Sequence, residues 1–188
     1  MYFPKSRTVI LEVPKCGSRT LVFAGKKVWG ENYFAGHLAL KKILARIDQE
    51  NRLRPINWQV DRAIRIFREP IDRFVSGLNY EAQTKNVKDD FRKHTLDYLI
   101  DRQFDGKSNT IYNPQHNWCP EKDQPVPVIT FPIHRMKDAL EEIGYTDTVV
   151  WENRSKQIFT RQDVENHPRY DEICKKYEHD FELWEKYK

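Results

Sequence analysis

The chain has 188 residues, which suits about one domain, and we expect a single domain over residues 1–188. Its 32 Lys and Arg residues against 28 Asp and Glu residues give a formal net charge of +4, too small and too evenly mixed for a dedicated nucleic-acid binder. No stretch approaches the roughly 18 uninterrupted apolar residues of a spanning helix, so we expect no membrane span.

The beginning of the chain and its cysteines indicate the compartment. The opening MYFPKSRTVILEV has a proline and charges where a signal peptide would have its apolar segment, so a native start at Met1 predicts a cytoplasmic protein. The three cysteines, Cys16, Cys119 and Cys174, are odd in number and far apart. We therefore expect neither a disulfide framework nor a cysteine-based zinc site.

Strands and helices alternate along the chain. In chain order the predicted elements are a strand at residues 8–13, helices at 20–28 and 37–47, a strand at 63–67, helices from 70 and at 87–103, a strand at 128–131, a helix at 136–143, a strand at 148–151 and a C-terminal helix through 173–184. A long Pro-rich loop is predicted over 112–127. The alternation predicts an α/β fold, a three-layer sandwich around a small parallel sheet.

Two of these elements have the clearest patterns. TVILEV, at residues 8–13, is a nearly continuous β-branched run, typical of a strand buried on both faces. The helix that begins at Pro70 has apolar residues at a spacing of three and four, which predicts a buried stripe. Arg73, Ser76 and Tyr80 fall on the other, non-core face of this helix.

The loops at 14–20 and 68–76 each follow a predicted strand. In open parallel sheets, ligands bind outside the carboxyl ends of the strands. We therefore expect the two loops to converge on one crevice.

The first loop, PKCGSRT, is a strand-to-helix turn with a lysine, a glycine and two hydroxyl residues. Such a turn can wrap backbone N–H groups and a helix N-terminus around a phosphate. The P-loop of nucleotide triphosphatases needs GxxxxGK followed by Ser or Thr, whereas here the lysine precedes the only glycine, so Mg²⁺-ATP hydrolysis of that type is not supported. The alternative is a tight connection without a ligand.

The second loop lies in RIFREPIDRFVSGL. Arg68, at the strand end, and Ser76, two helical turns later, can reach the same anion, because an Arg side chain offers paired N–H donors. The alternative is an ordinary amphipathic helix with a solvated face.

Together these two motifs resemble sulfotransferases that use 3′-phosphoadenosine 5′-phosphosulfate (PAPS), especially the carbohydrate 2-O-type and Golgi types. PKCGSRTL is similar to the loop that binds the 5′-phosphosulfate, and RIFREPIDRFVSGL to the element that binds the 3′-phosphate. NYFAGHLAL resembles the segment with the catalytic histidine, NPQHNWC an acceptor-side loop, ENRSK a short stretch after a late strand, and KKYEHDFELWEKY the closing helix. The likeness spans most of the chain, and the first two motifs are its specific part.

The resemblance implies a P-loop NTPase-like sulfotransferase fold and a set of PAPS-binding residues. Those expected at the 5′ end are Lys15, Cys16, Gly17, Ser18, Arg19 and Thr20; those at the 3′-phosphate are Arg68 and Ser76; Asn153 and Ser155 belong to the nucleotide-side stretch ENRSK. Cys16 and Arg19 stand where the family usually has small or hydroxyl residues.

Sulfuryl transfer needs a cation on the leaving phosphate and a base on the attacking hydroxyl, without an obligatory metal. Lys15 suits the first task. His37 suits the second, since a neutral imidazole can accept a hydroxyl proton near physiological pH. His37 could instead be a helix-terminal residue without a ligand, and the alternative bases are His116, His134, Glu12 and Glu81.

The sequence thus predicts a PAPS-dependent sulfotransferase that releases 3′-phosphoadenosine 5′-phosphate (PAP) and acts on a hydroxyl acceptor, expected to be a glycan or a small molecule. The alternatives are a P-loop-like nucleotide kinase or phosphotransferase, which would depend on ATP and Mg²⁺, and a non-catalytic nucleotide-binding module. The sequence contains no indication of an oligomeric state.

Overall fold

The computed structural model describes residues 1–84, 95–104, 110–119, 121, 124–148 and 156–188. The fold is α/β, as expected, around one four-stranded sheet of order β1-β2-β3-β4. Its strands are β1 (Tyr2–Phe3), β2 (Thr8–Leu11), β3 (Arg62–Phe67) and β4 (Val128–Pro132). Strands β2, β3 and β4 are parallel, whereas β1 pairs antiparallel with β2. The sheet is therefore mixed, and the expectation of a purely parallel one was wrong because β1 was not foreseen.

The predicted helices occur in the predicted order with shifted ends, and the helix at Arg161–Glu165 was not predicted. They are α1 (Ser18–Trp29), α2 (Leu40–Leu53), α3 (Pro70–Thr84), α4 (Leu96–Phe104), α5 (Met136–Glu142), α6 (Arg161–Glu165), α7 (Tyr170–Lys176) and α8 (Glu178–Tyr187), with short 3-10 helices η2 (Thr110–Tyr112), η3 (Gln115–Trp118) and η4 (Ile133–Arg135). The predicted C-terminal helix is two helices, α7 and α8, on either side of Tyr177. The strand predicted at 148–151 lies, apart from its first residue, outside the described residues.

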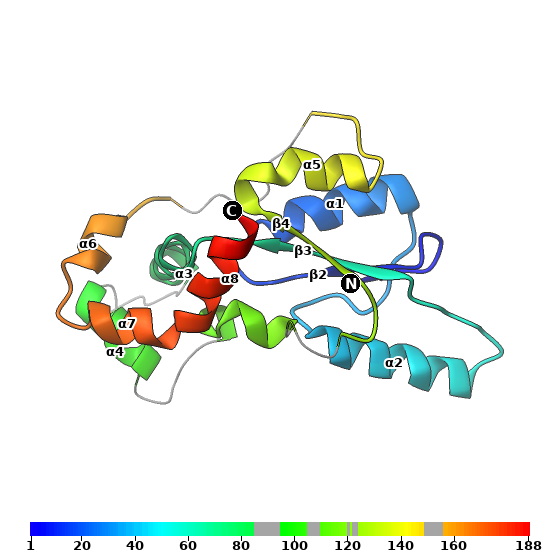
Figure 1. The fold of residues 1–188 in the computed structure, drawn as a ribbon, viewed down its shortest axis with the longest axis horizontal. Coiled ribbons are helices and arrows are strands. Elements are labelled where there is room, and N and C mark those ends of the chain that lie inside the picture. The colour runs from blue at the N-terminus through cyan, green and yellow to red at the C-terminus, as the bar shows by residue number, and fades with distance from the viewer. Residues whose placement is uncertain (85–94, 105–109, 120, 122–123, 149–155) are drawn as a thin grey trace.

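Helices cover both faces of the sheet. Figure 1 shows α1 and α5 on one face and α2 on the other. Ile10 of β2, Leu21 of α1 and Ile43 of α2 are all fully buried in a single apolar core. The continuous apolar run that predicted β2 thus reflects burial from two sides, since every residue of that strand is buried.

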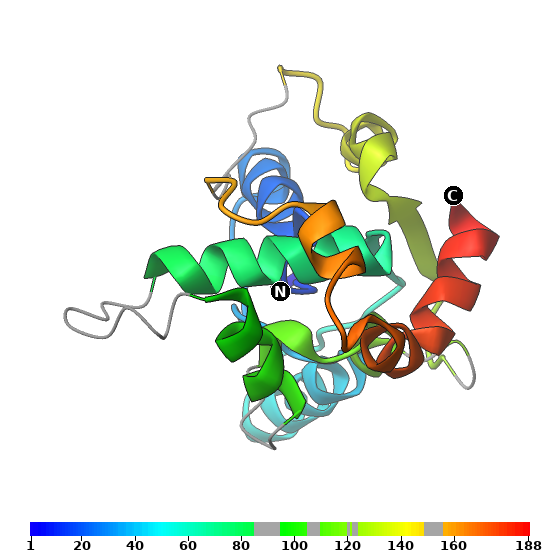
Figure 2. The same cartoon turned by 90° about the vertical axis from the view of Figure 1, so that its left-hand side faces the viewer.

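A second apolar core lies beyond the carboxyl edge of the sheet, among α3, α4, α6 and α7. Figure 2 views it from its own end, with α3 crossing the picture. The predicted stripe of α3 is buried there, with Phe74 packing against the rings of Tyr112 and Tyr177. Gly77 allows this close approach, because a Cβ at that position would lie 2.9 Å from a ring carbon of Tyr112. The helix α3 therefore joins the sheet to the second core.

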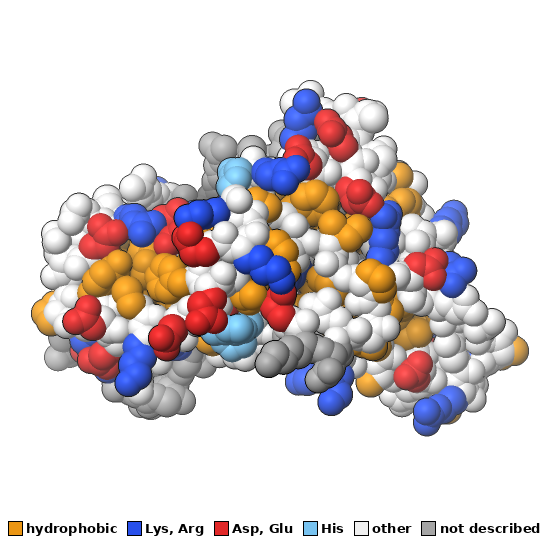
Figure 3. All heavy atoms as spheres, in the orientation of Figure 1, with side chains coloured by type: hydrophobic (Ala, Val, Ile, Leu, Met, Phe, Trp, Pro, Cys, Tyr) orange, Lys and Arg blue, Asp and Glu red, His pale blue; other side chains and the backbone are white. Residues whose placement is uncertain are grey.

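The surface has mixed charge. Figure 3 shows lysine, arginine and acidic side chains interspersed over the face that α8 occupies. None of the helices within the described residues has the length and apolar character needed to cross a bilayer.

Candidate functional site

The two loops meet at the carboxyl edge of the sheet. Strands β2 and β3 run parallel, with Leu11 opposite Arg65, so the loops that follow them leave the sheet at the same edge. The Arg68 guanidinium Nη1 donates a hydrogen bond to the carbonyl oxygen of Lys15, at 3.3 Å. The structure thus brings Lys15 and Arg68 together, although 53 positions separate them in the chain.

The β2–α1 loop curls tightly before the helix begins. Lys15 and Gly17 both have left-handed backbones, with φ of 62° and 75°. The hydroxyl of Ser18 donates to the carbonyl of Val13 at 3.1 Å, which closes the turn. Gly17 is the N-cap of α1 and no side chain caps the helix. The Thr20 N–H of the first turn donates to the Gly17 carbonyl at 3.0 Å, and the start of α1 carries the positive end of the helix dipole.

Three cations gather around this turn. The pKa of Lys15 is lowered to about 8, first by burial of its ammonium and then by the neighbouring charges of Arg68 and Arg19. Like charges held this close repel one another, and a bound anion would relieve that repulsion. The edge is therefore electrostatically prepared for a negatively charged ligand.

Helix α3 contributes its exposed face to the same place. The Lys15 ammonium lies 4.3 Å from the centre of the Tyr80 ring, a cation–π contact. Ser76 is one helical turn before Tyr80 and so shares its face of α3. The contact therefore places the predicted 3′-phosphate ligand Ser76 on the helix face that borders the β2–α1 loop.

Several predicted loop ligands point inward. The Cys16 thiol is fully buried and donates to Gln115 Oε1 at 2.9 Å, and burial raises the pKa of Cys16 to about 11. The side chains of Ser18 and Thr20 are also buried. The backbone N–H groups of Cys16 and Thr20 donate within the loop, to the carbonyls of Val13 and Gly17 at 3.4 and 3.0 Å. Toward a ligand in front of the loop, Lys15 and Arg19 can offer charged side chains.

Arg73 holds the β2–α1 loop from its buried side. Its side chain is 1% exposed, and it donates to the carbonyl oxygens of Pro14 at 3.0 Å and of Ile111 and Asn113, both at 2.8 Å. The expectation that Arg73 lies outside the core was wrong, because that part of α3 packs against residues 111–113. Gly77, one turn later on the same face, was the available signal that another segment comes close.

Gln115, which sequence reasoning missed, joins both loops. Its fully buried carboxamide accepts from the Arg68 backbone N–H at 3.0 Å and donates to the Arg68 carbonyl at 2.7 Å, while its Oε1 also accepts from Cys16. The segment NPQHNWC, predicted to be an acceptor-side loop, therefore contacts the residues predicted to bind the nucleotide.

His37 lies at the same edge but before α2 rather than within it. Its Nδ1 is 2.5 Å from the carbonyl oxygen of Glu12, and its ring meets that of Trp118 edge to face, at 6.0 Å between centroids. If Nδ1 carries the proton and donates to this carbonyl, Nε2 keeps its lone pair. That tautomer is the one a general base requires.

The alternative carboxylate bases are occupied in the interior. Glu12 is 8% exposed and accepts from the backbone N–H of Gly36 at 2.9 Å. Glu81 is 2% exposed, accepts from the Tyr112 hydroxyl at 2.9 Å and lies 3.5 Å from Arg102. Both carboxylates thus serve as internal hydrogen-bond acceptors.

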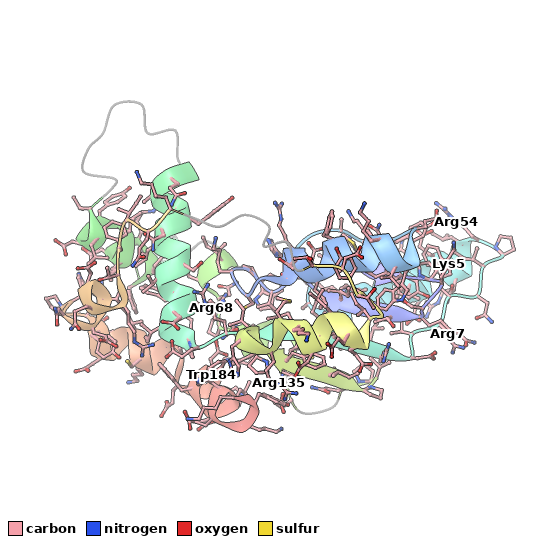
Figure 4. All side chains as sticks on the ribbon, turned by 90° about the horizontal axis from the view of Figure 1, so that it is seen from above. Lys5, Arg7, Arg54, Arg68, Arg135 and Trp184 are labelled. Atoms are coloured by element: carbon pink, nitrogen blue, oxygen red, sulfur yellow. The ribbon has the colours of Figure 1, made fainter. Side chains whose placement is uncertain are left out.

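The alternative histidines contact other elements. His116 Nδ1 lies 2.9 Å from Asp180 of α8. His134 packs edge to face against Trp184, which Figure 4 labels on α8, at 5.9 Å between ring centroids. Neither contact involves the β2–α1 loop.

The cationic edge is separate from the basic residues at the far end of the molecule. Figure 4 shows Arg68 where the sheet meets α3, with Lys5, Arg7 and Arg54 at the opposite end of the molecule. Arg7 and Arg54 pair with Asp61 and Glu50 there, at 2.6 and 3.0 Å. Asn153 and Ser155 lie outside the described residues. Within the part of the chain that is described, no cluster of three or more His, Cys, Asp or Glu side chains could hold a metal ion.

Comparison with protein-family models, with curated proteins and with solved structures finds no match for this chain. Its functional interpretation therefore depends on the residues of the carboxyl edge and on their geometry.

Proposed function

We propose that this chain is a PAPS-dependent sulfotransferase with a three-layer, P-loop NTPase-like fold, acting on a hydroxyl of a carbohydrate. The observation that carries the proposal is the hydrogen bond between Arg68 and the Lys15 carbonyl, which joins the two motifs that resemble the ends of a PAPS site. A ligand with two separate anionic groups suits two adjoining cationic loops.

The donor side fits PAPS in charge and in donors. The positive end of the α1 dipole, with the cations Lys15 and Arg19, suits the 5′-phosphosulfate. Arg68 and Ser76 suit the 3′-phosphate, because a guanidinium can donate two parallel hydrogen bonds to one phosphate. Bound PAPS supplies the activated sulfuryl group, whose transfer to an acceptor hydroxyl releases PAP.

Lys15 and His37 divide the chemistry between them. The Lys15 ammonium neutralises the charge that builds on the leaving phosphate oxygen. His37 Nε2 takes the proton of the acceptor hydroxyl as that oxygen bonds to sulfur, while the Glu12 carbonyl keeps the ring oriented through Nδ1. An oriented imidazole loses less entropy when it aligns with the acceptor hydroxyl for proton transfer.

Calorimetric titration with PAP and with ATP tests the nucleotide, and labelled PAPS with a panel of glycans tests transfer. We expect PAP to bind and ATP to bind far more weakly. Lys15→Ala and Arg68→Ala should each weaken PAP binding by about tenfold or more, since each removes a charge-assisted contact. Lys137→Ala, at an exposed cation of α5, is the control and should bind PAP like the wild type. Unchanged PAP affinity in both site variants would contradict the proposal.

His37→Ala separates binding from chemistry. It should bind PAP normally and lose transfer, because only the proton acceptor is removed. His134→Ala is the matched control, a histidine whose ring rests on Trp184, and should keep transfer. Full transfer in His37→Ala would assign the base to another residue.

A further inference from the structure

The buried carboxylate of Asp180 holds η3, the segment that contacts both loops. Asp180 of α8 is fully buried and accepts from the backbone N–H of Gln115 at 2.6 Å and from that of His116 at 3.0 Å. It also faces His116 Nδ1 at 2.9 Å. No side chain of η3 itself caps that helix, and Asp180 performs this function from a helix 65 residues away.

In this position the Gln115 carboxamide pairs with the backbone of Arg68. Its two hydrogen bonds fix both the N–H and the carbonyl of Arg68, and its third fixes the Cys16 thiol. The guanidinium of Arg68 then reaches back to the carbonyl of Lys15. One continuous set of hydrogen bonds thus runs from α8 through η3 to the two predicted phosphate-binding loops.

Burying such groups is costly for a fold. An amide or carboxylate loses free energy on leaving water unless its hydrogen bonds are remade, and an apolar side chain could fill the same space. We therefore expect the hydrogen bonds of Asp180 and Gln115 to fix the positions of η3 and Arg68, which an apolar side chain of the same size would not do.

We infer that Gln115 and Asp180 are positioning residues of the nucleotide site: Asp180 orients η3, and Gln115 holds Arg68 and the β2–α1 loop where they receive the two anionic ends of one nucleotide. This inference rests on the proposed function for its ligand. Neither side chain need touch the nucleotide; both act through Arg68 and Cys16.

The test uses Gln115→Met, which keeps the length of the side chain and removes all three hydrogen bonds, and Asp180→Asn, which keeps the shape and one acceptor oxygen. We expect the Kd of PAP to rise about tenfold in Gln115→Met and by a smaller factor in Asp180→Asn. With PAPS as substrate, KM should rise more than kcat falls, because His37 and Lys15 remain in place.

Asn51→Leu is the matched control. The Asn51 carboxamide makes the same two-bond pairing with the peptide of Trp58, donating to its carbonyl and accepting from its N–H, both at 2.8 Å. Asn51 lies in the last turns of α2, toward the end of the molecule where Figure 4 labels Arg54. A purely structural role for Gln115 predicts that both variants lower the melting temperature and that neither changes the Kd of PAP in the folded protein. Equal Kd values in Gln115→Met, Asn51→Leu and the wild type would overturn the inference.

Alkylation of Cys16 gives a readout without nucleotide. Iodoacetamide labelling of the native protein, mapped by mass spectrometry, should be about tenfold faster at Cys16 in Gln115→Met than in the wild type or Asn51→Leu, because the loop then opens more often. If the wild type binds no PAP, the proposed function fails, and Cys16 labelling still decides the positioning role. Equal labelling rates in all three proteins would contradict that role, and selective acceleration in Gln115→Met would support it.

Discussion

The loops after β2 and after β3 reach the same edge of the sheet by different means. The first is shaped by its backbone, with left-handed residues at Lys15 and Gly17 and no side-chain cap at the start of α1. The second passes almost directly into α3 at Pro70 and contributes the side chain of Arg68. The geometry of the first loop depends on its turn conformation. The position of the Arg68 side chain depends on the residues that hold Arg68 in place. The two halves should therefore fail in different ways when they are mutated.

We expect the largest effect from removing Arg73, which lies in α3 and holds the loop after β2 through the Pro14 carbonyl. Arg73→Leu leaves the buried carbonyls of Pro14, Ile111 and Asn113 without their donor, and should lower the free energy of unfolding by about 3 kcal/mol. Chemical denaturation measures the loss. Arg135→Leu, at an exposed arginine paired with Asp138, should change it by less than about 0.5 kcal/mol. Similar losses in the two variants would mean that the Arg73 contacts contribute little.

Gly17→Ala separates the backbone half from the side-chain half. A Cβ at a φ of 75° should cost about 1 kcal/mol of folding stability. Gly144→Ala is the comparison, since Gly144 has a φ of 77° and lies beyond α5, away from the anion site. We expect similar stability losses by thermal denaturation, with weaker PAP binding only in Gly17→Ala. Equal PAP affinity in both would show that the exact turn is unimportant.

The smallest expected effect is a pH dependence that sharpens the role of Lys15. Its folded pKa of about 8 lies below its ordinary value of 10.5, so between these values the unfolded chain binds more protons than the folded protein. Lys15 therefore makes the free energy of unfolding rise with pH in that window. PAP binding should follow the opposite trend, because the charged ammonium binds the anion, and affinity should fall about fourfold between roughly pH 7.5 and 9.

Lys15→Arg provides the control for this trend. A guanidinium stays charged throughout the range, so titrations of PAP should lose the component that comes from residue 15. In the wild type near pH 8, calorimetry in buffers of different ionisation enthalpy should detect uptake of up to about half a proton on binding. Identical pH profiles for the wild type and Lys15→Arg would assign the dependence to another group.

The sequence was informative where local pattern reflects burial. The apolar run of β2 and the stripe of α3 each depend on a few neighbouring residues. The meeting of the two loops also followed from local information, because parallel strands bring their carboxyl ends to one edge. The order of strands and loops along the chain was therefore enough to predict that Lys15 and Arg68 lie together.

Residues that act over long distances escaped prediction. Arg73 looks like a solvated charge in an amphipathic helix, and only the carbonyls of residues 14, 111 and 113 explain its burial. Gln115 gives no periodic signal, since its partners lie 47 and 99 positions away. The two residues of β1 are too few to show alternation. His37 was assigned to α2, which begins only at Leu40, because propensity locates helix ends poorly.

The position of Asp180 in α8 has a consequence for biosynthesis. A ribosome delivers a chain from its N-terminus, so β2, β3 and both loops emerge well before the carboxylate that seats η3. A nascent chain can form the sheet at that stage, yet Gln115 has no fixed seat until α8 has been translated and has docked. Translation that stops before α8 would thus leave Gln115 without its carboxylate partner, at the edge where we propose that a nucleotide binds.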